Sequence, residues 1–377
     1  MLTEQDTRLL GTPQPSQEHQ DGLAVTVLIP AHNEEATIEP AIASLWEQER
    51  RPDQIVVVAD NCSDRTVELA LGAGAQVLET IDNTDKKAGG LNQALDLLLP
   101  GSGEQDNFMI MDADTALVPE FLDTAMSRLA TDPDLGAVGG LFFGEPGGGL
   151  VGALQRNEYT RYQRDLALNE RKVMVLSGTA SVFRAQALRA VATARGDVLP
   201  GRHGQVYDTL AMTEDNELTV ALKTLGYQMV SPAECRNVTE VMTDWKSLWR
   251  QRERWQRGAI ENLRVYGWTP TTRKYWGQQL GIAYGVLSLQ LFFLLLIMTM
   301  LSVSSFAFYP FWIGVSLVFV IERVVTVWPA GWKARLIAAP LVIEIFYDIF
   351  IQAVFVKSVY DAIRRKDAGW NYVPREA

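Results

Sequence analysis

The segment LAVTVLIPAHNEEATIEPAIASLWEQERRPDQIVVVAD, residues 23–60, joins two apolar runs through a stretch with helical spacing. Residues 23–31 and 53–60 are rich in Val, Ile and Leu, which is typical of strands buried on both faces of a parallel sheet. Residues 34–49 have apolar side chains at helical spacing and predict a helix between the two strands. This strand, helix and strand predict an α/β fold.

The same alternation continues along the chain. Residues 65–75 and 88–99 predict helices, and residues 76–80 and 107–114 predict strands. Ligands of such sheets bind at the carboxyl ends of the strands. Polar residues gather at three of these ends: His32, Asn33 and Glu34, which follow Pro30 and Ala31; Asp60, Asn61 and Asp64; Asp112 and Asp114. Three acidic clusters at one sheet edge predict a nucleotide and metal site.

The motif MDADT, residues 111–115, supplies the expected metal ligands. Asp112 and Asp114 can jointly hold a hard divalent cation, which in turn binds diphosphate oxygens. For an isolated Asp-x-Asp, a turn with two solvated aspartates is the ordinary interpretation. The apolar residues 107–111 place this pair at the end of a buried strand, and this favours a metal site.

The motif DKKAGGLNQAL, residues 85–95, places Lys86 and Lys87 before two glycines. A lysine beside a close backbone approach suits a diphosphate. The segment lacks the full phosphate-loop pattern. By itself it is therefore a weak indication of phosphate binding.

The motif TED, residues 213–215, begins a predicted helix. Thr213 is expected to cap that helix, with Asn216 or Glu217 in its first turn. Asp215 is also well placed to accept a proton from a hydroxyl group. The motif therefore has both a capping and a catalytic interpretation.

The composition narrows the class of protein. The 377 residues carry a formal net charge of -11, which argues against general nucleic-acid binding. Residues 1–22 lack a basic region followed by an apolar core, so we expect a flexible tail rather than a signal peptide. Cys62 and Cys235 are expected to be reduced thiols in a cytoplasmic domain.

A long apolar region follows residue 275. No charged residue occurs between Lys274 and Glu322, which allows two membrane crossings joined by the turn-like SSFAFYP, residues 304–310. Residues 336–356 are also long enough to cross, but Glu344 and Asp348 lie on one helical face. This third segment either spans the bilayer or lies at its interface. If all three segments cross, the basic residues 364–366 end outside, against the positive-inside tendency.

The segment TDWKSLWRQRERWQRGAIENLR, residues 243–264, predicts an amphipathic helix. Residues 244–275 hold eight basic and three acidic side chains. On one helical face we expect a surface at the bilayer interface, made by Trp245, Leu248, Trp249, Ala259, Ile260 and Leu263. Gln251, Arg254, Trp255 and Gly258 cluster on an adjacent face. The simpler interpretation is a basic amphipathic membrane helix without catalytic residues.

Seven segments together resemble the family 2 glycosyltransferases. They are VTVLIPAHNEEATI, IVVVADNCSDRT, KAGGLNQAL, MIMDADT, SGTASVFRA, MTEDNEL and QRERW, and they cover about residues 24–265. The chain looks like the membrane-embedded branch that includes cellulose, chitin, hyaluronan and poly-N-acetylglucosamine synthases. The resemblance implies a GT-A (Rossmann-like) fold that binds a UDP-sugar and transfers the sugar with inversion.

The resemblance also implies roles for individual residues. Donor binding is expected from Ala31, His32, Glu34, Asp60, Lys87, Asp112, Asp114, Gln251, Arg254 and Trp255. Acceptor binding is expected from Ser177, Gly178, Thr179, Glu214 and Trp255, with Asp215 as the general base. Asp112 and Asp114 would bind Mg²⁺ or Mn²⁺. Two positions depart from the family pattern: Ala59 stands where many relatives have Asp, and His32 stands where Tyr is common.

The implied organisation has five parts. A tail (1–22) precedes a GT-A catalytic domain (23–242) and interface helices carrying the QxxRW motif (243–275). A transmembrane region of two or three helices (276–358) and a second tail (359–377) follow. We expect a multi-pass protein of the cell membrane with its catalytic domain on the cytoplasmic side.

The small membrane region leaves the product and its acceptor open. Either several chains assemble into a homo-oligomer that secretes a β-linked glycan, or the product is short and stays on the cytoplasmic face. The acceptor would be a glycan, a lipid or a protein, and single-sugar transfer is the alternative to polymerisation. A catalytically inactive nucleotide-sugar-binding membrane module is an alternative of a different class.

Overall fold

The computed structural model describes residues 8–12, 22–171, 173–302 and 310–364. It divides the chain into two compact units. The first unit contains Met1–Pro146 and Tyr162–Val241, and the second contains Gly147–Arg161 and Met242–Ala377. Residues 147–161 therefore belong to the second unit, although the sequence analysis placed them within the catalytic domain.

Four parallel strands form the centre of the first unit, in the order β4-β3-β2-β5. They are β2 (Ala24–Ala31), β3 (Gln54–Ala59), β4 (Gln76–Glu79) and β5 (Asp106–Met111). All four were predicted from their apolar runs. Because β2 pairs in register with both β3 and β5, the carboxyl ends of these three strands meet at one edge.

The complete sheet is mixed rather than parallel. It has eight strands in the order β1-β4-β3-β2-β5-β9-β7-β10, and β9 (Ala180–Arg184) runs antiparallel to β5 and to β7 (Leu135–Gly139). The strand β10 (Gln228–Val230) pairs parallel with β7. A second sheet has the order β6-β11-β8, formed by β6 (Ala116–Leu117), β11 (Arg236–Thr239) and β8 (Leu141–Gly144).

The antiparallel direction of β9 has a consequence for the site. Ala180 pairs with Met111 at the carboxyl end of β5, so residues 177–179 lie beside Asp112. The Asp112 amide donates to the Thr179 carbonyl oxygen at 3.1 Å. Because β9 begins at the carboxyl end of β5, it must run antiparallel to β5. The sequence analysis predicted a parallel sheet, and this strand is where that prediction was wrong.

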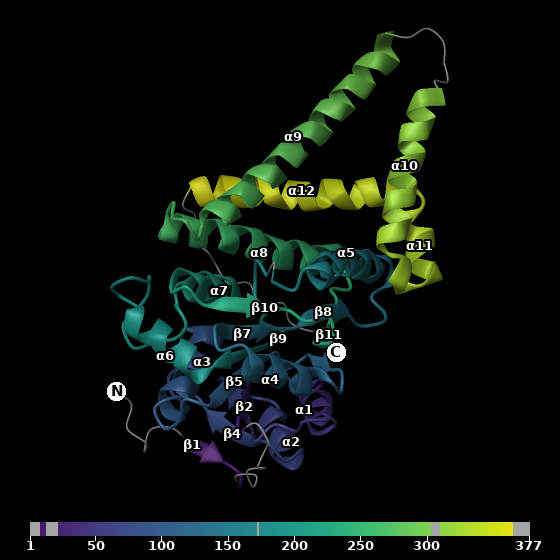
Figure 1. Cartoon of the computed structure of the whole chain (residues 1–377). Helices are drawn as coiled ribbons and strands as arrows, with labels where there is room; N and C mark the ends of the chain where they lie inside the picture. Colours follow the sequence, from purple (N-terminus) through teal and green to yellow (C-terminus); the bar gives the residue numbers. More distant parts are fainter. Residues whose placement is uncertain (1–7, 13–21, 172, 303–309, 365–377) are drawn as a thin grey trace. The chain divides into compact units, whose positions relative to one another are not determined.

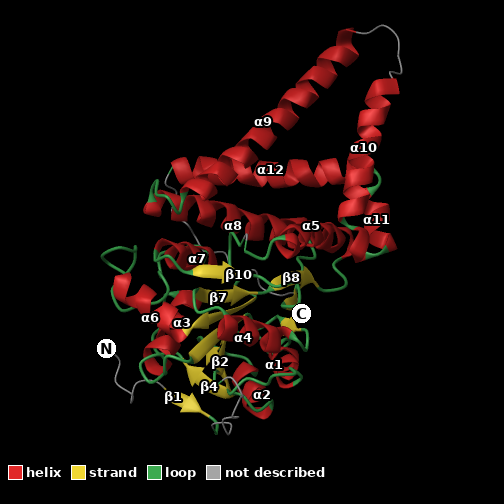
Figure 2. Ribbon diagram, in the orientation of Figure 1, coloured by secondary structure: helices red, strands yellow, loops and turns green. Residues whose placement is uncertain are grey.

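Helices cover both faces of the large sheet (Figures 1 and 2). They are α1 (Ile38–Trp46), α2 (Thr66–Gly72), α3 (Lys86–Leu98), α4 (Phe121–Thr131), α6 (Ala185–Ala194) and α7 (Glu214–Thr224). Ile42 of α1 and Phe121 of α4 pack with Val27 and Val57 in one apolar core. This confirms the predicted α/β class with its buried strands.

The N-terminal residues differ from the expected flexible tail. Arg8–Leu10 form strand β1, which pairs antiparallel with β4. The rest of residues 1–21, apart from Gly11 and Thr12, lies outside the described residues. Cys62 and Cys235 are free thiols, as predicted.

The second unit is helical and begins within α5 (Gly149–Leu168). Its other helices are α8 (Trp245–Tyr266), α9 (Arg273–Ser302), α10 (Pro310–Thr326), η1 (Trp328–Ala330), α11 (Trp332–Ala338) and α12 (Leu341–Ile363). Asp244 caps α8, since its carboxylate accepts from the amides of Lys246 and Ser247.

One helix in the described part of the chain, α9, is long and apolar enough to cross a bilayer. The pair α11 and α12 meets the same test only as one broken span, because the chain bends by 77° between them. The expectation of two or three crossings is therefore supported for one segment only. The predicted turn at residues 304–310 lies almost entirely outside the described residues, as do residues 365–377 of the C-terminal tail.

Helix α12 packs along α8 (Figure 1). Phe350 of α12 contacts the rings of Trp245 and Trp249 edge-on, with centroids 4.9 and 5.5 Å apart. These two tryptophans were expected at a bilayer interface; both also contact Phe350 of α12, and their position at a bilayer stays a prediction. Leu248 and Tyr347 are buried together in the same contact. The packing favours an α12 that runs along α8 at the interface over an α12 that spans the bilayer.

The acidic residues of α12 are paired within the second unit. Glu344, 1% exposed, receives both terminal nitrogens of Arg161 at 2.9 Å. Arg323 of α10 donates to Asp348 at 2.8 Å. Carboxylates paired in this way are costly to remove one at a time, and they fix α12 to α5 and α10.

Candidate active site

The turns after β2 and β3 are held together at the sheet edge. Asn33 and Asn61 have left-handed backbones with φ of 58° and 50°, a conformation that Asn tolerates well. The Asn33 side-chain oxygen accepts from the Ser63 amide at 2.7 Å. His32 Nδ1 lies 2.6 Å from the Asp60 carbonyl oxygen. The predicted donor residues Ala31, His32 and Asp60 are thus brought together.

Asp60 presents a carboxylate whose orientation is fixed. Its Oδ1 accepts from Asn61 at 2.9 Å and from Thr80 and Asn83 at 2.8 Å. No described residue donates to its Oδ2, which leaves that oxygen for a ligand. Asp64 differs, since its two oxygens accept from Thr66 and from the Glu35 amide and so serve the turn itself.

Lys87 links two acidic groups at the centre of the site. Its ammonium lies 2.6 Å from Asp112 Oδ1 and 3.0 Å from Glu214 Oε1. Burial opposes the charge on Lys87, but Asp112, Glu214 and Asp215 raise its pKa well above the ordinary value. The lysine therefore stays cationic and joins the predicted metal-binding strand end to Glu214, the residue before the predicted base Asp215.

Gly89, the first of the two glycines after Lys87, makes a close contact within the chain itself. A Cβ on Gly89 would clash with the Asn83 side-chain oxygen and would lie 2.7 Å from the Asp85 Cβ. The close approach is therefore to the chain's own turn before α3, and phosphate binding by this segment stays a prediction. The glycine packs α3 against the residues that orient Asp60.

Asp112 and Asp114 form a carboxylate pair suited to a divalent cation. Burial raises the pKa of Asp112, Lys87 lowers it and Asp114 raises it again, so that the net shift is upward. No group of three or more His, Cys, Asp or Glu gathers at metal distance among the residues described. Mg²⁺ commonly takes one or two carboxylates together with water and substrate phosphates, so this pair fits.

Asp215 stands at the start of α7 and faces the 177–179 segment. Its Oδ2 accepts from the Gly178 amide at 3.1 Å, and its Oδ1 accepts from the Asn216 amide at 2.7 Å. Burial and then Glu214 raise the pKa of Asp215 to about 6. A Cβ on Gly178 would lie 3.2 Å from Lys87 Nζ and 3.4 Å from Asp215 Oδ2, so a glycine keeps this space open.

The other predicted acceptor residues lie beside Asp215. Ser177 Oγ and Thr179 Oγ1 are 2.8 Å apart, and Ser177 and Gly178 line a small cavity together with Lys87, Glu214 and Asp215. The structure thus brings together the predicted metal, base and acceptor residues of the first unit.

Tyr207 lines the same small cavity and was missed by the sequence analysis. It is 3% exposed, and the Asn92 side chain of α3 fixes its backbone through two hydrogen bonds. The Tyr207 amide donates to Asn92 Oδ1 at 2.8 Å, and Asn92 Nδ2 donates to the Tyr207 carbonyl oxygen at 2.9 Å. Burial raises the pKa of Tyr207 far above its ordinary value, so its hydroxyl stays protonated and can donate. No spacing in the segment GQVYDTL pointed to it; only the long-range contact with Asn92 does.

The capping prediction for α7 was only partly right. Thr213 occupies the N-cap position, but its side chain makes no capping hydrogen bond. Glu217, expected in a capping box, is 1% exposed and instead pairs with Arg195. The two terminal guanidinium nitrogens of Arg195 donate to the two carboxylate oxygens of Glu217 at 2.7 and 2.6 Å. This buried pair fixes the helix that carries Asp215.

The QxxRW residues lie on α8 in the second unit. The Arg252 guanidinium stacks 4.4 Å from the Trp255 ring centroid and is itself held by Glu158 at 3.0 Å. Gln251 Oε1 is buried and has no hydrogen-bond partner among the described residues. Trp255 is therefore held in place, and the roles of Gln251, Arg254 and Trp255 stay predictions.

Comparisons with known proteins agree with this geometry. A sequence model described as "Glycosyltransferase like family 2" matches residues 22–258. The poly-beta-1,6-N-acetyl-D-glucosamine synthase of Staphylococcus aureus is 24% identical over 245 residues, which are 63% of this chain and 55% of that protein. The synthase of Staphylococcus epidermidis is 24% identical over 271 residues, 68% of this chain and 60% of that protein. The matched part thus spans little more than half of these relatives.

One solved structure resembles almost the whole chain. The mannosyltransferase PcManGT from Pyrobaculum calidifontis, in complex with GDP-Man and Mn²⁺, superposes with a TM-score of 0.60 and 17% identity. The match covers 96% of this chain and 91% of that one, which shows a shared GT-A fold. The strand-end carboxylates and the family match lead to one assignment: this chain is a glycosyltransferase and belongs to family 2.

Proposed function

We propose that this enzyme transfers a hexose or N-acetylhexosamine from a UDP-sugar to an acceptor hydroxyl, with inversion at the anomeric carbon. The observation that carries the proposal is the position of Asp215 beside Gly178, with Lys87 bridging the neighbouring Glu214 to Asp112. Inversion needs in-line attack by a hydroxyl, a base to take its proton, and stabilisation of the departing diphosphate. Asp215 supplies the base.

The donor half of the proposal rests on the edge residues of the first unit. Asp60 and His32 would contact the uridine, and Asp112 and Asp114 would hold Mg²⁺ or Mn²⁺. When bound, the cation neutralises charge on the diphosphate. Lys87, kept cationic by its carboxylate neighbours, adds positive charge on the same side. The complex of PcManGT with GDP-Man and Mn²⁺ supports a nucleoside diphosphate sugar with metal.

The acceptor and the product are proposed from the relatives. The staphylococcal relatives are synthases of poly-beta-1,6-N-acetyl-D-glucosamine, so we propose a β-linked glycan as the product. Single-sugar transfer to a lipid or a protein is the alternative. Sizing the product made from a radiolabelled UDP-sugar separates them, because a ladder of lengths supports polymerisation and a single added sugar contradicts it.

We also propose that α9 inserts into the cytoplasmic membrane and that α12 follows α8 at its surface. The exposed apolar side chains of α9, among them Leu287, Leu291 and Leu295, support insertion. The packing of α12 on α8 supports the interfacial arrangement. A homo-oligomer stays a prediction, which the mass of the detergent-solubilised chain would test.

Arg254→Ala is expected to lower kcat/KM about 100-fold or more, because removal of one preorganised donor to a developing anion commonly costs that much. The proposal for Arg254 rests on the QxxRW resemblance. The measurement is the rate of UDP release by the membrane-bound chain. Arg250→Ala is the matched control, since it removes one arginine from the same helix and should keep at least half of the activity. Equal losses in both variants would contradict a specific role for Arg254.

The activity is expected to fall at acid pH. Because burial and Glu214 raise the pKa of Asp215 to about 6, the base is ionised above that value and protonated below it. We expect kcat/KM to reach a plateau above pH 7 and to fall about tenfold per unit well below pH 6. Glu214→Gln should move the midpoint to lower pH, because it removes a charge that raises this pKa. A profile flat from pH 5 to 8 would contradict the assignment.

The proposed function is tested by UDP release across a panel of UDP-sugars with Mg²⁺, with Mn²⁺ and with chelator. The result expected is metal-dependent release with one preferred donor. Background release with every donor, together with retained UDP binding, would instead support the catalytically inactive binding module.

A further inference from the structure

The QxxRW motif, residues 251–255 on α8, has two positions without an assigned role. They are occupied by Arg252 and Glu253. Arg252 pairs with Glu158 of α5 at 3.0 Å. Glu253 pairs with Lys357 of α12 at 2.6 Å. The motif is therefore attached to two neighbouring helices through residues that all belong to the second unit.

Arg252 is a buried cation that lies against two aromatic rings. Its side chain is 6% exposed, and its Cζ lies 4.4 Å from the centroid of the Trp255 ring and 5.5 Å from that of Tyr159. Burial opposes the charge, but Glu158 and then Tyr159 raise the pKa of Arg252 above its ordinary value. The guanidinium therefore stays charged, and a cation shielded from water is attracted to the face of an aromatic ring.

One carboxylate oxygen sets the orientation of this guanidinium. Glu158 Oε2 accepts from Arg252 Nη2 at 3.0 Å. Arg252 Nε is buried and has no hydrogen-bond partner among the described residues, so Glu158 is the polar contact that orients the side chain. A shift of the Glu158 carboxylate would turn the guanidinium and change how it covers the Trp255 ring.

The same oxygen is held by a hydroxyl group from α12. The Tyr347 hydroxyl donates to Glu158 Oε2 at 2.5 Å, a short bond of the kind that a hydroxyl makes with a charged acceptor. Tyr347 is 4% exposed and is buried in one apolar cluster with Leu248 of α8. The position of α12 is thus transmitted to the Trp255 ring through Glu158 and Arg252.

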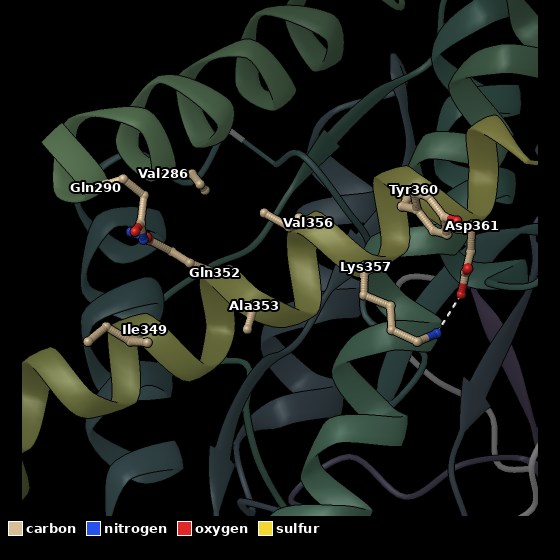
Figure 3. A pocket seen from close by; sticks show the side chains of 9 residues that line it. All are labelled: Val286, Gln290, Ile349, Gln352, Ala353, Val356, Lys357, Tyr360 and Asp361. Atoms are coloured by element: carbon tan, nitrogen blue, oxygen red, sulfur yellow. Dashed lines mark hydrogen bonds and ion pairs between the residues drawn. The ribbon is translucent and has the colours of Figure 1, made fainter. Parts of the chain in front are cut away.

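Glu253 attaches the motif to α12 at a second point. Its two carboxylate oxygens accept from Lys357 Nζ at 2.6 Å and from Trp249 Nε1 at 3.0 Å. Lys357 and Asp361 lie one turn apart on α12 and pair with each other (Figure 3). Because the Lys357 side chain is 43% exposed, these pairs contribute little to stability. They fix which residues of α12 lie beside the motif.

We infer that Glu158 and Tyr347 are positioning residues for sugar transfer. They act on the ring of Trp255 rather than on the substrate. The Tyr347 hydroxyl holds the Glu158 carboxylate in place. That carboxylate keeps Arg252 against Trp255, whose ring then has one orientation. The inference rests on the proposed role of Trp255 in donor and acceptor binding, and it makes transfer dependent on the docking of α12 on α8.

The environment of the Trp255 ring is measured without any substrate. The full-length chain is labelled with 5-fluorotryptophan and purified in detergent, and fluorine NMR then reports on its ten tryptophans. The signal that is lost in Trp255→Phe belongs to Trp255. Tyr347→Phe removes only a hydroxyl group and should shift this signal by more than its linewidth. Tyr360→Phe removes a hydroxyl group from an exposed position of the same helix and should leave the signal unchanged.

A second variant tests the shared carboxylate. Glu158→Gln keeps the size of the side chain but removes the charge that orients Arg252, so it should shift the same Trp255 signal. Glu158→Gln combined with Tyr347→Phe should give no larger shift than Glu158→Gln alone, because both changes act through one carboxylate. A shift equal to the sum of the two would contradict this connection.

A destabilised variant separates positioning from a general loss of packing. Val354→Ala removes two methyl groups from a fully buried position of α12 and should lower the unfolding temperature at least as much as Tyr347→Phe does. It should leave the Trp255 signal in place. An equal shift of that signal in Val354→Ala would assign the effect to loosened packing and overturn the inference.

Sugar transfer is expected to fall in Tyr347→Phe while nucleotide binding is kept. The rate of UDP release should decrease about tenfold, because a small displacement of a group that positions the substrate can cost up to about 100-fold. UDP affinity, measured by titration calorimetry with Mn²⁺, should stay unchanged. Tyr360→Phe should alter neither quantity.

The outcomes distinguish this inference from the proposed function. The NMR measurement needs no sugar donor, so a failure of the proposed transfer reaction does not affect it. An unchanged Trp255 signal in both Tyr347→Phe and Glu158→Gln would overturn the inference even in a chain that transfers sugar. A shifted signal with an unchanged rate of UDP release would also overturn it, since the orientation of the ring would then not matter for the reaction.

Discussion

Asp215→Asn is expected to lower the rate of sugar transfer by about 100- to 10,000-fold, the usual contribution of a positioned general base. The amide keeps the size of the carboxylate and can still accept a hydrogen bond from Gly178 or Asn216, but it cannot take the proton of the acceptor hydroxyl. UDP binding should persist, since Asp60, Asp112 and Asp114 are unchanged. The measurements are UDP release with a saturating donor and UDP affinity by titration calorimetry.

The unfolding temperature provides the control for this variant. Because burial raises the pKa of Asp215, the folded state disfavours its ionised form at neutral pH. By linkage, stability from this group is greatest at low pH and is lost as the pH rises through its folded pKa. The neutral Asp215→Asn should therefore unfold at an equal or higher temperature than the wild type at pH 7. Near-normal turnover in this variant would refute the assignment of the base.

Arg195→Met is expected to destabilise the protein by about 3–5 kcal/mol, because it leaves Glu217 buried without its partner. Arg195 is 0% exposed and binds both carboxylate oxygens of Glu217, and it also donates to the carbonyl oxygens of Val206 and Pro200. A loss of this size corresponds to roughly 10 °C in unfolding temperature for a domain of this class. Thermal unfolding of the detergent-solubilised chain measures it.

Two further variants isolate the buried pair. Arg195→Met combined with Glu217→Met should recover much of the lost stability, since neither charge is then left unpaired. Arg128→Met removes a partner of Glu170 from an equally bidentate pair whose side chains are 43% and 32% exposed. That control should cost less than about 1 kcal/mol. Equal losses in Arg195→Met and Arg128→Met would contradict the argument from burial.

Local pattern was enough to predict the centre of the fold. The strands β2 to β5 and helices α1, α2, α3 and α7 follow from apolar periodicity, and the strand-end rule placed Asp60 and Asp112 at one edge. The direction of β9 did not follow, because a short apolar strand such as ASVFR has the same pattern in either direction. The membership of residues 147–161 in the second unit likewise depends on contacts with residues more than eighty positions away, such as Gln155 with Met242.

The residues of the candidate site also divide into those that the sequence predicted and those that only the structure places. Asp112, Asp114, Asp215 and Gly178 lie in motifs with a chemical interpretation, and the structure brings them together. Tyr207 and Arg195 lie in segments without such a motif, and only the folded chain places them beside Asn92 and Glu217. The helical wheel found the apolar face of α8 but not its contact with α12, because the spacing of apolar residues does not say which apolar surface they meet.

The most direct measurement of the central claim is the anomeric configuration of the product, determined by NMR after incubation with the donor that gives the highest UDP release. The UDP-sugars of the proposed reaction carry an α linkage, and direct in-line attack assisted by Asp215 predicts a product that is β-linked throughout. An α-linked product, or UDP release without any glycosylated acceptor, would contradict it.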